Sequence, residues 1–168
     1  MNRKVELSEE NYDLLDEVIH QLCEQGRLLE EQNAMQHGST SVYEHSVNVA
    51  YKSLLLVENY RLPVDKQSLV RGALLHDYFL YDWHEKNKEH SLHGFKHPYF
   101  ALRNASRDFR LNDIEKNVIV RHMFPLTPIP PKCREAWIVC MADKYCSARE
   151  TMYTVKRYAH NARQFVFG

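Results

Sequence analysis

The chain has 168 residues, of which 44% are apolar and 26% are charged, and its 22 basic side chains balance its 22 acidic ones. This composition is typical of a globular domain with its own core and excludes a disordered or fibrous chain. The balanced charge predicts no nucleic-acid footprint, and every apolar run falls far short of the ~20 residues that span a membrane. We therefore expect a soluble, cytoplasmic protein that binds a small molecule, with neither nucleic acid nor a membrane as a partner.

Apolar residues recur with helical spacing along the chain and predict an all-α fold. We expect a single compact domain over residues 1–168, built from about six to eight helices. The expected helices cover residues 8–25, 41–60, 65–77, 99–109, 113–122, 135–152 and 153–163. The first and the last of them are expected to be peripheral. No alternating pattern of strand length occurs, so no β-sheet is predicted.

Capping residues and prolines mark the expected breaks between these helices. Asp65 is a plausible N-cap of the third helix, and Pro98 suits the first turn of the fourth. His97 would then lie at the N-terminal edge of that helix, because the residue before a proline resists helical geometry. Residues 78–94 have little periodicity and predict a long functional loop. Four prolines between residues 125 and 131 predict a stiff connection, which we interpret as a rim of the pocket.

Histidines are unusually frequent, and six of the ten lie between His76 and His122. His45 and His122 each continue the apolar stripe of their helix, so their imidazoles are expected to point inward. Asp77 ends an apolar helix, and Asp143 follows a run of nearly all apolar residues on another. A buried carboxylate must find a partner or a metal ion.

Each of these residues alone has an ordinary structural explanation. A lone inward histidine is more often a satisfied core residue, and a lone aspartate within a helix is usually exposed or capping. Several metal-competent side chains directed at one interior, with few inward Lys or Arg residues to pair with them, together favour a metal site.

In order and spacing, His45, His76-Asp77 and Asp143 resemble the pattern of the HD superfamily of metal-dependent phosphohydrolases, from about Tyr43 to Glu150. The resemblance implies that His45, His76, Asp77 and Asp143 hold one metal ion. It also implies that His97, His122 and a bridging Asp77 hold a second. Imidazole and carboxylate ligands suit Mn, Fe, Co, Ni or Zn better than Ca, and the pattern leaves open which of these binds and whether one or two ions are held.

The resemblance further implies hydrolysis of a phosphoester by a metal-bound hydroxide, with Asp77 as the catalytic residue that orients it. The expected substrate is a nucleotide or another small phosphorylated metabolite. Tyr78-Phe79-Leu80 stands where many relatives have Ile-Gly-Lys, and the Gly-Tyr-Pro signature of cyclic-dinucleotide phosphodiesterases is absent. Both departures weigh against that substrate class.

Three further side chains are candidates for contacting the substrate, namely His93, Lys144 and Arg149. An exposed, solvated face explains Lys144 and Arg149 equally well. Two other functions remain open at this point. One is a di-iron oxygenase of the HD type, and the other is a non-catalytic nucleotide-binding module.

Overall fold

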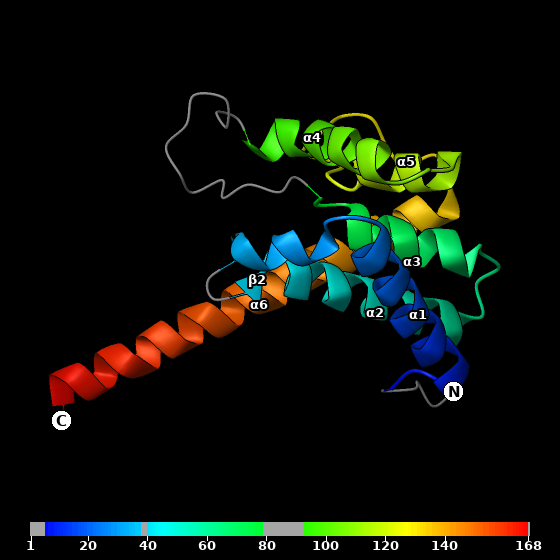
Figure 1. Cartoon of the computed structure of the whole chain (residues 1–168). Helices are drawn as coiled ribbons and strands as arrows, with labels where there is room; N and C mark the ends of the chain where they lie inside the picture. Colours follow the sequence, from blue (N-terminus) through cyan, green and yellow to red (C-terminus); the bar gives the residue numbers. More distant parts are fainter. Residues whose placement is uncertain (1–5, 38–39, 79–92, 168) are drawn as a thin grey trace.

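Helices make up most of this computed structural model. It describes residues 6–37, 40–78 and 93–167, with the backbone alone for 36–37, 93–94 and 156–167. The helices are α1 (Glu9–Gln25), the 3-10 helix η1 (Leu28–Asn33), α2 (Val42–Tyr60), α3 (Lys66–Leu75), α4 (His93–Asp108), α5 (Asp113–Arg121) and α6 (Arg134–Phe167) (Figure 1). The predicted all-α fold is confirmed. In the part of the chain that the structure describes, no helix has the length and apolar character needed to cross a membrane.

A short antiparallel pair of strands, β1 (Met35–His37) and β2 (Thr40–Ser41), connects η1 to α2. No strand was predicted here from the sequence. Strands of three and two residues are too short to show the alternation by which strands are recognised in a sequence.

Side-chain caps fix where three of the helices begin. Ser41 forms a capping box with Glu44 at the start of α2, and Asn112 forms another with Glu115 at the start of α5. Asp65 caps α3 as predicted, because its side chain accepts a hydrogen bond from the backbone N–H of Ser68. Each cap of this kind stabilises a helix by about 1 kcal/mol.

Helix α3 lies at the centre of the packing and contacts α1, α2, α4, α5 and α6. Its side chains Leu69, Leu74 and Leu75 are fully buried. The helix approaches α5 closely at Gly72, where an added Cβ would lie 2.9 Å from Cβ of Val118. The C-terminal end of α3 therefore lies in the interior of the protein.

Helix α4 begins at His93, earlier than the predicted start at residue 99. Pro98 consequently lies inside the helix, and His97 is a helical residue rather than an edge residue, so this part of the prediction was wrong. A proline near the start of a helix forfeits one backbone hydrogen bond while its φ stays helical, so the helix tolerates it. The loop expected over residues 78–94 falls mostly on residues 79–92, which lie outside the described residues.

Helix α6 is continuous from Arg134 to Phe167, so the predicted separate helix over residues 153–163 is wrong. Neither Gly nor Pro occurs between these bounds, and nothing else in the sequence ends a helix there. The C-terminal part of α6 projects from the rest of the molecule (Figure 1).

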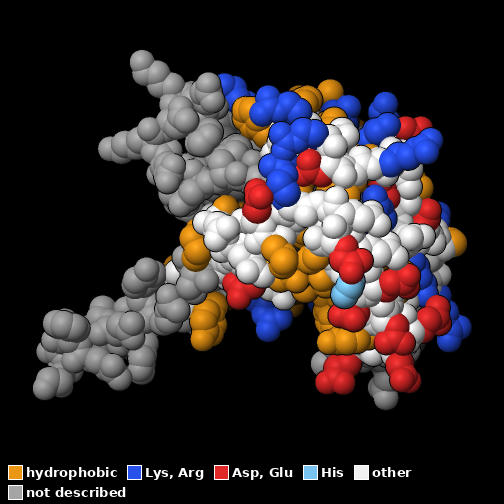
Figure 2. Space-filling view, viewed as in Figure 1, with side chains coloured by type: hydrophobic (Ala, Val, Ile, Leu, Met, Phe, Trp, Pro, Cys, Tyr) orange, Lys and Arg blue, Asp and Glu red, His pale blue; other side chains and the backbone are white. Residues whose placement is uncertain are grey.

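Surface charge is divided between the two ends of the molecule in the view of Figure 2. Lys and Arg side chains gather over α4 and α5, whereas Asp and Glu side chains gather around α1. The chain as a whole is nevertheless neutral.

One acidic side chain, that of Glu31 on η1, is buried in the core and only 1% exposed. Among the described residues, neither of its carboxylate oxygens has a hydrogen-bond partner. Burial raises the pKa of Glu31 well above its ordinary value of 4.5, and the nearby charge of Asp77 raises it further. Because the folded protein holds this proton more tightly than the unfolded chain does, Glu31 reduces stability increasingly as the pH rises above 4.5.

We predict that Glu31→Met stabilises the metal-free protein. An unsatisfied buried polar group is unfavourable by about 1–3 kcal/mol, so the free energy of unfolding should rise by about that amount near neutral pH. The gain should shrink in acid, where Glu31 is protonated in both states. Urea unfolding at two pH values measures both effects, and Glu30→Met, at the exposed neighbour, is the control. A less stable Glu31→Met protein would show that the carboxyl is satisfied after all.

Candidate metal centre

The six side chains that the sequence analysis proposed as metal ligands are all buried, and they come from five helices or helix ends. His45 lies on α2, His76 and Asp77 follow α3, His97 lies on α4, His122 follows α5, and Asp143 lies on α6. Their exposed fractions do not exceed the 7% of Asp143. The structure thus brings the predicted set into one interior region.

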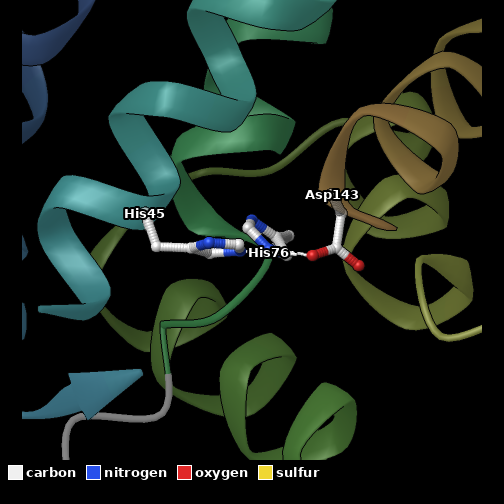
Figure 3. A group of neighbouring side chains, drawn as sticks. All are labelled: His45, His76 and Asp143. Carbon is white, nitrogen blue, oxygen red and sulfur yellow. Dashed lines mark hydrogen bonds and ion pairs between the residues drawn. The ribbon is translucent and has the colours of Figure 1, made fainter. Parts of the chain in front are cut away.

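A first group is formed by His45, His76 and Asp143 (Figure 3). His45 Nε2 lies 3.2 Å and His76 Nε2 lies 3.9 Å from the same Oδ1 atom of Asp143. The group places two imidazole nitrogens and a carboxylate oxygen around one point, which is the arrangement a transition-metal ion requires.

A second group surrounds the carboxylate of Asp77. Its Oδ1 atom lies 3.2 Å from His97 Nε2 and 3.4 Å from His122 Nε2, and those two nitrogens are 2.8 Å apart. Its Oδ2 atom lies 3.3 Å from His76 Nε2. His76, Asp77 and His122 also offer ligand atoms within 4.8 Å of one another. Asp77 therefore faces the first group with one oxygen and the pair His97–His122 with the other.

Backbone carbonyls fix the tautomers of two of these histidines. His76 Nδ1 lies 2.7 Å from the carbonyl oxygen of Ala73, and His122 Nδ1 lies 2.8 Å from that of Ile119. A carbonyl only accepts hydrogen bonds, so both Nδ1 atoms must donate. In the neutral ring the lone pair is then on Nε2, the atom that points into the site.

Glu150 fixes the His45 ring in the same way, through a hydrogen bond from Nδ1. Its Oε2 atom accepts a hydrogen bond from His45 Nδ1 at 2.9 Å, on the side of the ring away from Asp143. Glu150 was not among the site residues predicted from the sequence. It lies on the same face of α6 as Asp143 and Ser147, at a spacing of four and then three residues, and Ser147 Oγ donates to Asp143 Oδ1 at 3.2 Å. That spacing is the signal by which it could have been found.

The electrostatics of the site keep both aspartates ionised. Burial by itself would raise the pKa of Asp77, but the charges of His76 and His97 outweigh it and hold that pKa well below the ordinary value. Burial likewise opposes ionisation of Asp143, yet the hydrogen bond from His45 lowers its pKa to about 2. Two buried negative charges therefore need positive charge close by, from protonated imidazoles or from a metal ion.

The pKa values of the buried histidines are shifted in different directions. Burial lowers the pKa of His45, but hydrogen bonds to Asp143 and Glu150 outweigh it and raise the pKa to about 10. The pKa of His76 is also raised, because the charge of Asp77 outweighs burial. Burial lowers the pKa of His122 below its ordinary value, which favours the neutral form that binds metals.

These residues fit a bound metal ion. Among the described residues, His76 Nε2 forms no hydrogen bond, although it is buried and faces the carboxylates. A buried imidazole nitrogen without a hydrogen bond needs an explanation, and a bound ligand toward which the ring is oriented provides one. The donor set of imidazole nitrogens and carboxylate oxygens suits Mn, Fe, Co, Ni or Zn.

The three side chains predicted to contact the substrate do not lie together as the proposed metal ligands do. Lys144 Nζ donates to the carbonyl oxygen of His122 at 2.8 Å, so it secures the end of α5 beside the site. Arg149 is exposed on α6 and lines a groove on the other side of Glu150. The side chain of His93 lies outside the described residues. Substrate roles for these three residues stay predictions.

Comparison with known proteins gives one clear result. The family model of the HD domain matches residues 42–148, a stretch that contains all six of the proposed ligands and more than half of the chain. No curated protein and no solved structure gives a significant match. The matched stretch also spans the helices α2 to α5 and the part of α6 that carries Asp143. The chain therefore belongs to the HD domain family.

Proposed function

We propose that this protein is a metal-dependent phosphohydrolase that cleaves a phosphoester of a nucleotide or another small phosphorylated metabolite. HD domains are generally metal-dependent phosphohydrolases, and the chain matches that family over residues 42–148. The observation that carries the proposal is the convergence of imidazole Nε2 atoms on the carboxylates of Asp77 and Asp143. As a purely structural element, such a cluster would stabilise the core less well than apolar side chains of similar volume.

His45, His76, Asp77 and Asp143 would hold one metal ion, and His97, His122 and Asp77 would hold a second. Bound ions of this kind supply a Lewis acid that activates water near neutral pH and stabilises charge on phosphoryl oxygens. The low pKa of Asp77 makes its carboxylate a weak base. Its role is therefore to hold and orient the centre rather than to remove a proton.

The surrounding helices supply rigidity to this arrangement. His76 and His122 are each tied to the carbonyl three residues earlier on their own helix, so neither ring can turn without breaking a buried hydrogen bond. Lys144 links α6 to the end of α5 through the carbonyl of His122. A site held in this way needs little rearrangement to bind its ions.

We predict that Asp77→Asn abolishes both metal binding and catalysis. The variant removes the charge that faces both groups, and we expect phosphate release to fall by at least ~100-fold. Metal content is measured by elemental analysis, and phosphate release is followed on a panel of nucleotides and sugar phosphates with Mn, Fe, Co, Ni or Zn added. Asp113→Asn, at a fully exposed position of α5, is the matched control.

Three outcomes of that experiment would contradict the proposed function. Undiminished phosphate release by Asp77→Asn would remove Asp77 from the site. Turnover that requires iron and dioxygen would favour an oxygenase, and metal binding without turnover on any phosphoester would favour a non-catalytic module.

Metal affinity should rise with pH. The pKa of about 10 means that His45 is protonated on both ring nitrogens near pH 7 in the metal-free protein, and the raised pKa of His76 favours the same form. A metal ion must displace such protons. The dissociation constant should therefore fall by about tenfold per pH unit for each proton displaced. Calorimetric titration with Zn or Mn in buffers of different ionisation enthalpy measures affinity and proton release together. An affinity that does not change between pH 6 and pH 8 would contradict these protonation states.

Glu150 is expected to tune metal affinity through His45. Removing the carboxylate in Glu150→Ala should weaken metal binding by about 10–100-fold, which is typical for the partner of a metal-binding histidine. Glu150→Gln, which retains an oxygen acceptor for His45 Nδ1, should recover part of the loss. Glu24→Gln at an exposed position of α1 serves as the control. Wild-type metal affinity in Glu150→Ala would exclude this role.

A further inference from the structure

A groove between α2 and α6 lies on the other side of Glu150 from the metal centre. It has a volume of about 590 Å³, within the range of roughly 300–1,000 Å³ that small-molecule sites occupy. It is lined by Thr40, Asn48, Tyr51, Lys52, Leu55, Tyr145, Cys146, Arg149, Glu150 and Tyr153. Basic and aromatic side chains are prominent in this lining.

The two basic side chains of the groove are available to an anion. Neither Lys52 nor Arg149 forms an ion pair with a carboxylate within the described ranges 6–37, 40–78 and 93–167. Some other basic side chains are paired, as Arg71 is with Glu115 at 2.7 Å. Lys52 Nζ instead lies 4.3 Å from the centre of the Tyr145 ring, so the ammonium group and an aromatic face already lie together.

Aromatic rings form the rest of the recognition surface. Tyr145 is 49% exposed and Tyr153 is 68% exposed, and both line the groove together with Tyr51. Exposed tyrosine rings next to unpaired cations suit a ligand that has a flat ring and a phosphate group. A smaller hollow of about 500 Å³ continues along α6 over Ala148 and Met152 and shares Tyr145, Arg149 and Tyr153 with the groove.

The groove is separate from the metal centre. Glu150 lines the groove, and its Oε2 atom accepts from His45 Nδ1 at 2.9 Å. The opposite nitrogen of the same imidazole, Nε2, faces Asp143 at 3.2 Å. A carboxylate and a whole imidazole ring therefore stand between a ligand in the groove and the proposed metal ions.

We propose that the α2–α6 groove is a second binding site, for a phosphorylated aromatic compound of the nucleotide class, distinct from the site of hydrolysis. The cations Lys52 and Arg149 bind the phosphate, and the tyrosine rings bind the base. This inference goes beyond the proposed hydrolase activity and does not require it.

The test measures binding of AMP, adenosine and inorganic phosphate to the full chain by calorimetry, with a chelator present so that the metal centre is empty. AMP should bind at least tenfold more tightly than either adenosine or phosphate. The double variant Lys52→Met/Arg149→Met should weaken AMP binding by at least tenfold, and Tyr145→Ala should weaken both AMP and adenosine. Lys116→Met, an exposed lysine of α5, should leave all three unchanged.

Two further measurements separate this site from the metal centre. Asp77→Asn should bind AMP as the wild type does, and the double variant should retain its metal content. All changed groove residues are at least partly exposed, and circular dichroism checks that each variant is folded. AMP binding no tighter than that of phosphate, AMP binding that survives the double variant, or AMP binding that is lost in Asp77→Asn would each overturn the proposal.

Discussion

The negative charge of Asp77, 2% exposed at the end of an apolar helix, is the constraint around which the other elements are arranged. An isolated buried carboxylate is strongly unfavourable, so the helices that meet at the end of α3 supply compensating groups. His76 meets one carboxylate oxygen, and His97 and His122 meet the other. The same charges lower the pKa of Asp77, and a divalent ion would satisfy the carboxylate more fully than protonated imidazoles do.

The same helix-end hydrogen bond holds two of these imidazoles. His76 and His122 each occupy the C-cap of a helix, and each donates from Nδ1 to the carbonyl three residues earlier. Carbonyls in the last turn of a helix lack helical partners, so the hydrogen bond satisfies the helix end and also directs Nε2 into the site. The negative end of the helix dipole at both places further favours a cation.

Helix α6 connects the interior of the protein to its surface. It supplies Asp143 to the buried group, and two turns later it supplies Glu150, which contacts His45 from the other side. Beyond Glu150 the same helix forms one wall of the groove that carries Lys52 and Arg149. The groove proposed as a second binding site thus lies on the outer part of α6, without direct access to the candidate metal centre.

The sequence by itself determined most of the α-helices, the Asp65 cap and the burial of His45, Asp77, His122 and Asp143, because apolar periodicity and capping residues act within a few neighbouring positions. It did not indicate that α4 includes His97, that α6 continues past Met152, that Lys144 binds the carbonyl of His122, or that Glu150 supports His45. Only the tertiary structure decided these points. His45 and Glu150 are 105 residues apart in the chain, and their contact depends on how α2 packs against α6, which no local pattern specifies.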